Sequence, residues 1–81
     1  MRIRVFVTPR HGILDPQGRT VEAALANLGF TGVNQVHVGR CIELELDAPS
    51  TMAAEEIVRR MCEQLLANPT IEDYRFEVES G

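Results

Sequence analysis

Polar and apolar residues alternate along four short stretches of this chain, and this period of two constrains the fold more than any other feature. In residues 2–7 every second side chain is Ile or Val, between Arg2, Arg4 and Phe6. The same alternation recurs over residues 35–38, 42–47 and 74–79. A period of two places alternate side chains on opposite faces of a strand. Each stretch is therefore predicted to be a strand with one buried face.

Two other segments carry apolar residues at helical spacing. The first stripe, which begins at Val21, predicts a helix from about Pro16 to Leu28, ended by Gly29 as a left-handed cap. The second follows the hydroxyl caps in Pro49-Ser50-Thr51 and stops before Asn68-Pro69, since the residue before proline is pushed out of the helical region. Both helices are predicted to be amphipathic.

The predicted order of elements is βαββαβ, the split βαβ pattern of ferredoxin-like folds. Gly39-Arg40 is expected to form a tight hairpin turn between the second and third strands, with Gly39 at positive φ. We expect an α+β fold with two helices on one face of a four-stranded antiparallel sheet in the order 4-1-3-2. Arg2 and Arg4 would then lie between the glutamates of residues 42–47 and 74–79.

Gly18 is unexpected at its position, because it falls in the first turn of a helix whose start is predicted by Asp15-Pro16. Glycine in a helix costs about 0.5–1 kcal/mol relative to alanine. Residues 15–18 also match a type I turn, whose geometry a first helical turn shares. We therefore begin the helix near Pro16, with Gly18 in its first turn.

The chain has 81 residues and a formal net charge of −4. We expect a single domain over residues 1–81, with a core so small that its stability margin is only about 3–5 kcal/mol. We expect association with other chains to supply the missing stability, because two cysteines, Cys41 and Cys62, are too few for a disulfide framework. The acidic balance predicts no nucleic-acid partner, and the absence of a long apolar run or signal peptide predicts a cytoplasmic protein without a membrane span.

Groups that could carry chemistry do not converge in the sequence. His11 follows the first strand and could act as a general base, yet no nucleophile lies at a recognisable spacing, so an exposed loop histidine is favoured. His37 and Cys41 flank the expected hairpin, but two ligands are too few for a structural zinc site. The glycine-containing loops match no nucleotide-binding motif. We expect no catalytic residue, bound cofactor or metal in this chain.

Three stretches of the sequence resemble the PurS family, the small subunit of phosphoribosylformylglycinamidine synthase. They are VTPRHGILDPQGRTVEAALANLGF, VNQVHVGRCIELEL and MCEQLLANPTIEDYRFEVE, in this order and over nearly the whole chain. Family members commonly carry Lys near Arg10 and Arg40 and another residue near Cys41. The resemblance implies a single PurS-like domain without a catalytic site of its own.

The resemblance also implies partners. A PurL-type synthetase subunit uses ATP, Mg and ammonia, and a PurQ-type glutaminase subunit frees that ammonia from glutamine. The small subunit is expected to join them in purine biosynthesis, to support ammonia transfer and to form a homodimer or higher homo-oligomer. In such a subunit, the missing side chain of Gly18 is expected to let a neighbouring backbone approach. We expect partner contacts in the loop and helix start after the first strand, at the glycine turn and near the end of the second helix: Arg10, His11, Asp15, Gly18, Gly39, Arg40, Asn68 and Tyr74.

A regulatory module of the ACT type, which binds a small molecule between two copies, shares the same order of elements. ACT modules usually carry a glycine-rich turn that leads directly into the first helix. Here TPRHGILDPQG inserts a longer segment that contains proline. This difference favours the adaptor subunit over the ACT-like alternative.

Overall fold

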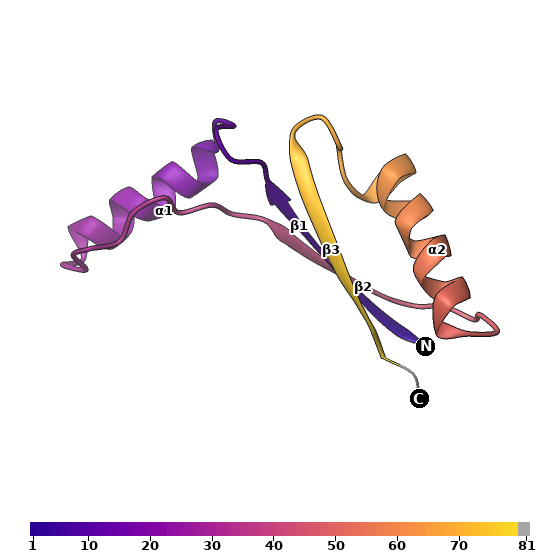
Figure 1. The fold of residues 1–81 in the computed structure, drawn as a ribbon. Helices are drawn as coiled ribbons and strands as arrows, with labels where there is room; N and C mark the ends of the chain where they lie inside the picture. The colour runs from indigo at the N-terminus through magenta and orange to yellow at the C-terminus, as the bar shows by residue number, and fades with distance from the viewer. Residues whose placement is uncertain (80–81) are drawn as a thin grey trace.

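A three-stranded antiparallel sheet forms the centre of the computed structural model, which describes residues 1–79 (Figure 1). Strand β1 (Arg2–Pro9) lies between β2 (Arg40–Glu45) and β3 (Glu72–Glu79), in the order β2-β1-β3. The last two residues of the predicted domain, 80 and 81, lie outside the described residues. The prediction that the first strand is central, flanked by the two acidic stretches, is confirmed.

The register of the sheet pairs arginines with glutamates across the strands. Arg4 lies opposite Glu43 on β2 and Glu77 on β3, and Arg2 lies opposite Glu45 and Glu79. Arg4 Nε lies 3.3 Å from Glu43 Oε1, and its Nη1 lies 3.8 Å from Glu79 Oε1. This open face of the sheet carries the predicted opposite-charge pairs, which favour a single register.

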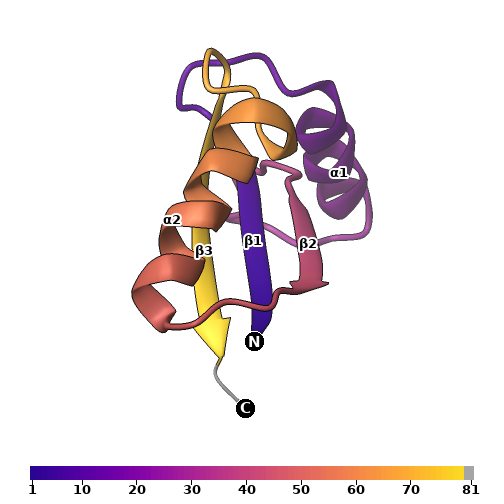
Figure 2. The same ribbon diagram turned by 90° about the vertical axis from the view of Figure 1, so that its right-hand side faces the viewer.

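The other face of the sheet is packed against helix α2 (Thr51–Met61) and the π-helical turn η1 (Cys62–Leu66) that continues it. Ser50 caps α2 by accepting the backbone N–H of Ala53 at 3.1 Å. The core is formed by fully or nearly fully buried apolar side chains: Ile3, Val5, Val7, Ala54, Val58, Cys62 and Ala67. In Figure 2, α2 lies across β3 and leaves β2 without a covering helix.

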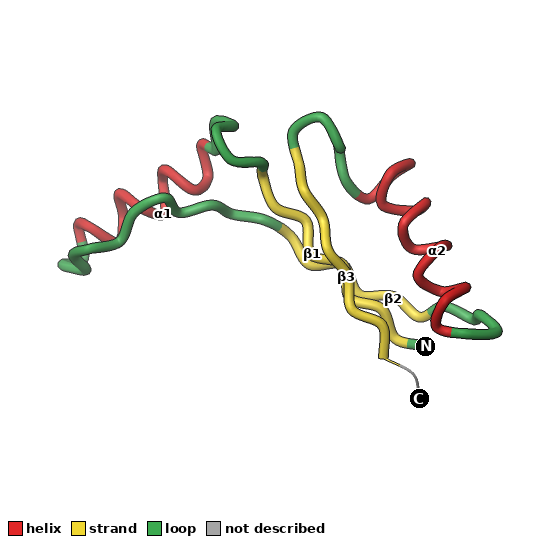
Figure 3. Tube along the Cα trace, viewed as in Figure 1, coloured by secondary structure: helices red, strands yellow, loops and turns green. Residues whose placement is uncertain are grey.

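Helix α1 (Pro16–Asn27) does not pack on the sheet but projects away from it (Figure 1). The chain then returns toward the sheet through residues 30–39, drawn as loop beside the helix in Figure 3. We call residues 16–38, the helix with its returning segment, the arm. The arm explains a radius of gyration of 15.9 Å, since a compact domain of this length has about 12 Å.

The predicted four-stranded sheet with both helices on one face is therefore wrong. Residues 35–38 do not join the sheet, and Gln35 has φ +53°, which is outside the extended region. The backbone N–H groups of Val36 and Val38 donate instead to a carboxylate on α1 and to the carboxylate that caps it: Val36 N to Glu22 Oε1 at 3.1 Å, and Val38 N to Asp15 Oδ2 at 2.8 Å. Because side chains take these donors, the segment stays with α1 and not with a neighbouring strand.

The predicted hairpin at Gly39 is also wrong, because the chain runs through Gly39 directly into β2. Positive φ in the described residues occurs at Gln35 and at Gly12, Gly29 and Gly32, and Gly39 is not among them. A Cβ at Gly39 would instead collide with the carbonyl oxygen of Val7. Gly39 is therefore required by the close approach of two backbones. Gly29, at φ +95°, has the left-handed conformation predicted after the first helix.

Candidate functional site

The arm carries most of the large apolar side chains that are exposed in the described residues. Nine large apolar side chains are well exposed in residues 1–79, and six of them lie on the arm or immediately before it. These six are Leu14, Val21, Leu28, Phe30, Val33 and Val38. Leu14 and Leu28, which lie just before and just after α1, are exposed by 72% and 73%. Exposed apolar side chains gathered on one part of a small chain favour an association site.

Helix α1 meets the returning segment at Gly18, which is buried. A Cβ at Gly18 would collide with the carbonyl oxygen of Val36 and crowd the Asp15 carboxylate. The neighbouring backbone that the sequence led us to expect is thus another part of the same chain. Gly18 is required for the returning segment to approach the helix, and its role in a partner contact stays a prediction.

Asp15 holds both the start of α1 and the end of the returning segment. Its Oδ1 accepts the backbone N–H of Gly18 at 3.0 Å as the predicted helix cap, and its Oδ2 accepts that of Val38 at 2.8 Å. His37 Nδ1 lies 3.4 Å from the same Oδ2. The hydrogen bonds from Gly18 and then from Val38 lower the pKa of the Asp15 carboxyl below its usual value. The residue therefore links two segments that are distant in sequence.

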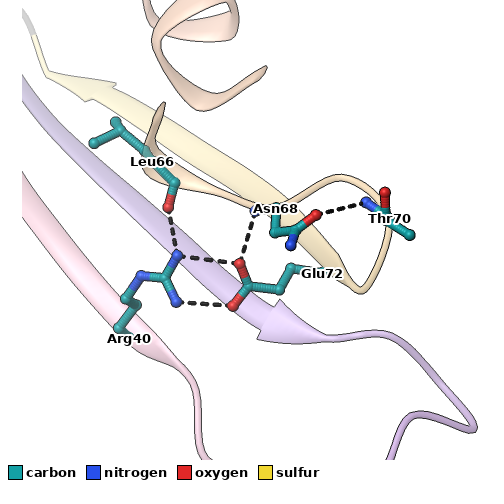
Figure 4. Close-up of polar contacts among 5 residues, drawn as sticks. All are labelled: Arg40, Leu66, Asn68, Thr70 and Glu72. Atoms are coloured by element: carbon teal, nitrogen blue, oxygen red, sulfur yellow. Dashed lines mark hydrogen bonds and ion pairs between the residues drawn. The ribbon is translucent and has the colours of Figure 1, made fainter. Parts of the chain in front are cut away.

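A second cluster of polar side chains lies where the arm continues into β2 (Figure 4). The Arg40 guanidinium donates to Glu72 through two nitrogens, at 2.8 and 3.1 Å, and to the Leu66 carbonyl oxygen at 2.6 Å. Glu72 Oε1 also accepts the backbone N–H of Asn68 at 2.8 Å. Arg40, followed by this Asn68 hydrogen bond, lowers the pKa of the Glu72 carboxyl.

Arg10 approaches the same place from β1. Its backbone N–H donates to the Ile71 carbonyl oxygen at 2.9 Å, and its Nε donates to the Glu72 carbonyl oxygen at 3.4 Å. The Nε also lies 3.5 Å from Asp73 Oδ1. Three residues predicted from separate turns, Arg10, Arg40 and Asn68, are therefore brought together around the start of β3, with Gly39 next to them.

The two remaining candidates lie apart from this cluster. His11 is exposed and lines an open hollow between the loop after β1, the start of α1 and residues 34–37. Tyr74 points to the covered side of the sheet, where its hydroxyl donates to Glu63 Oε1 at 3.4 Å. Burial, with a further contribution from Glu63, raises the pKa of the Tyr74 hydroxyl. Whether either residue contacts a partner stays a prediction.

Sequence reasoning missed Glu22, His37 and Glu72 as residues that position the arm. Glu72 has one local signal, since it lies four residues after Asn68, whose backbone N–H it accepts. Its pairing with Arg40 spans 32 positions and had no local signal. Glu22 had none either, because an exposed glutamate on a helix ordinarily faces solvent.

Within residues 1–79, no group of three or more His, Cys, Asp or Glu side chains is placed to hold a metal ion. In the same range, no helix has both the length and the apolar character needed to cross a membrane. What the described residues do present is an apolar arm and two clusters that hold it. These features define a small α+β association module.

Comparison with known proteins identifies the module. The family model PurS, described as phosphoribosylformylglycinamidine (FGAM) synthase, matches residues 2–80. The chain is 48% identical to phosphoribosylformylglycinamidine synthase subunit PurS of Synechocystis sp. over 75 residues, which cover 93% of this chain and 75% of that protein. This chain therefore belongs to the PurS family, whose members are subunits of FGAM synthase.

Solved structures agree with this membership. PurS of Methanocaldococcus jannaschii, one of the subunits of formylglycinamide ribonucleotide amidotransferase in the purine biosynthetic pathway, superposes with a TM-score of 0.84 at 37% identity. That comparison covers 96% of this chain and 94% of the other. A chain in the structure of PurLQS from Thermotoga maritima superposes with a TM-score of 0.85 at 34% identity, over 94% of this chain and 93% of that one.

Proposed function

We propose that this chain is the adaptor subunit that joins a PurL-type, ATP-dependent synthetase subunit to a PurQ-type glutaminase subunit and supports ammonia transfer between them. The relative from Thermotoga maritima, solved as PurLQS, supports this proposal. In this reading the chain itself binds no cofactor, whereas the complex uses ATP, Mg and glutamine. The site of action is the cytoplasm, where purine nucleotides are assembled.

The observation that carries the proposal is the exposed apolar side of the arm. An arm with a single layer has no core of its own, so it needs cover from another surface. A second copy supplies that surface: α2 leaves β2 without a helix, and the inward side chains of β2, Ile42 and Leu44, and of Leu46 just after it are only half-buried. We infer a symmetric homodimer in which the arms contribute the central contact.

Reconstitution tests the adaptor function. The purified chain alone is expected to show neither glutaminase nor ligase activity, and to restore glutamine-dependent amidine formation when it is mixed with the two other subunits. Co-purification in the presence of glutamine and ADP should give a complex of all three. Turnover that is equally fast without this chain would overturn the adaptor function.

Sedimentation equilibrium tests the homodimer separately. Leu28→Glu places a charge on the exposed side of the arm and is expected to shift the chain to monomer at micromolar concentration. Met52→Glu is the matched control, because Met52 is exposed by 80% but lies at the start of α2, away from the arm. A wild-type chain that is already monomeric, or a Leu28→Glu variant that dimerises as tightly as the control, contradicts the proposed interface.

His11 allows a test of whether the chain contributes chemistry of its own. Since His11 is exposed, we expect His11→Ala to leave the reconstituted rate within a few-fold of wild type. The loss of a general base lowers the rate by about 10²-fold or more. A loss of that size in the reconstituted complex would assign a catalytic role to His11.

A further inference from the structure

Both connections between the arm and the sheet run past one short segment, residues 66–73, which joins η1 to β3. We call it the collar. It comprises the last residue of η1, the Asn68-Pro69 turn and the first two residues of β3. Helix α1 itself has hardly any contact with the strands or with α2. The direction in which the arm leaves the sheet therefore depends on these two connections.

The connection that leads from β1 to α1 is held by Arg10. The backbone of Arg10 donates to the Ile71 carbonyl oxygen at 2.9 Å, and its side chain reaches the Glu72 carbonyl oxygen and the Asp73 carboxylate. The backbone hydrogen bond lies one position beyond the last paired residues of the two strands, Pro9 and Glu72. It extends the hydrogen bonding between the chain after β1 and the collar by one residue toward the arm.

The connection that leads from the arm back into β2 is held by Arg40. Its two hydrogen bonds to Glu72 have the fork geometry that fixes the orientation of a guanidinium. Its third, to the Leu66 carbonyl oxygen, places the charge at the end of η1, where a cation is favoured. The adjoining Gly39 lies tightly against the Val7 carbonyl, so the backbone on the arm side of Arg40 has little freedom.

We propose that the collar is a positioning device, which holds the arm in one direction relative to the sheet and so sets the geometry of assembly. The inference rests on the proposed homodimer, because the collar would hold each arm in the orientation that the dimer requires. A partly exposed ion pair contributes little to stability, and Arg40 is 50% exposed. Its two-pronged geometry is better suited to fix an orientation, which lowers the entropic cost of association.

Spin-label distances within one chain test the proposal. In a Cys41→Ser background, Asn27→Cys places one label at the tip of α1 and Glu77→Cys places the other on the sheet, while Cys62 is fully buried. Dilution of the labelled chain with excess unlabelled chain removes distances between copies. The wild-type background is expected to give one narrow distance distribution.

Arg40→Ala is expected to broaden that distribution and to weaken self-association about tenfold, a coupling of the usual size between linked sites. Glu72→Gln keeps the shape of the side chain but removes its charge, and it should also broaden the distance distribution. Arg59→Ala is the control, since Arg59 also has an ion pair, 3.3 Å from Glu56, but lies on α2. A folded Arg40→Ala or Glu72→Gln variant with the control's narrow distribution overturns the proposal.

The two proposals can fail independently. If the wild-type chain is monomeric, the proposed homodimer is wrong, but the label distances are intramolecular and still report on the collar. If the chain dimerises and the distribution does not respond to either substitution, the collar does not position the arm. Circular dichroism of each variant establishes that it is folded, and Glu72→Gln provides a second variant should Arg40→Ala not fold.

Discussion

Val38 donates its backbone N–H to the carboxylate of Asp15, 23 positions earlier in the chain, at 2.8 Å. The same carboxylate caps helix α1, so one side chain fixes both the start of the helix and the segment that returns along it. A strand at residues 36–38 would have used this N–H in a sheet. Because Asp15 and Glu22 accept the N–H groups of Val38 and Val36, these hydrogen bonds hold the returning segment against α1.

Gly18→Ala tests how closely the returning segment is packed on α1. In an ordinary helix the substitution would stabilise by about 1 kcal/mol. Here the new Cβ collides with the Val36 carbonyl oxygen, so we expect a net destabilisation of about 1–3 kcal/mol, as for other overpacked sites. Faster hydrogen exchange at the Val36 and Val38 amides should accompany it. A variant as stable as wild type, with unchanged exchange, would contradict this account.

Glu72 should make stability depend on pH in the acid range. Its pKa in the folded protein lies below its ordinary value of 4.5, chiefly because of Arg40. The stability it contributes is therefore fully present above that ordinary value and is lost as the pH falls through the folded pKa. Denaturant unfolding of the wild type between about pH 2.5 and pH 6 should show this loss. The Glu72→Gln variant should lose less stability over the same pH range. A pH profile of stability identical to that of the wild type would argue against the ion pair of Glu72 with Arg40.

Much of the sheet could be predicted from sequence because its signals are local. Alternation over residues 2–7 places Ile3 and Val5 in the core and Arg4 on the open face, as the structure confirms. The arm could not be predicted, because Val36 and Val38 alternate as a strand would, whereas their N–H groups donate to Glu22 on α1 and to Asp15, its N-cap. Alternation of side chains does not say which groups the backbone pairs with.

The candidate site also has a part that could be predicted from the sequence and a part that could not. Arg10, Arg40 and Asn68 were each recognised at a turn, where polar residues are informative. Their convergence depends on Glu72, which in sequence is one acid among several in EDYRFEVE. Its one local signal, a position four residues after Asn68, does not indicate a pairing with Arg40, and Glu77 and Glu79 belong to the open face. Only the antiparallel pairing of β1 with both edge strands brings Glu72 to Arg40.

Two matched substitutions compare how the core and the arm contribute to stability. Val58→Ala removes a fully buried side chain beneath α2, and should cost about 2 kcal/mol at any protein concentration. Val21→Ala changes a residue on the exposed side of the arm, 40% exposed in the single chain. Its effect should appear only through association, as a melting temperature whose deficit depends on protein concentration. Equal, concentration-independent losses for both variants would mean that Val21 does not lie in an interface.

The two cysteines should differ sharply in reactivity in the folded protein. Cys41 is exposed on the open face of the sheet, whereas Cys62 is fully buried under α2. Burial, with a smaller contribution from Glu63, raises the pKa of the Cys62 thiol, so little thiolate is present at neutral pH. An alkylating reagent under native conditions should modify Cys41 quickly and Cys62 only at the rate of unfolding, as mass spectrometry of the peptides would show. Addition of denaturant is the positive control, because it should make the two rates similar. Rapid native labelling of Cys62 would mean that α2 and η1 open frequently from the sheet, and the packing described for the core would then be wrong.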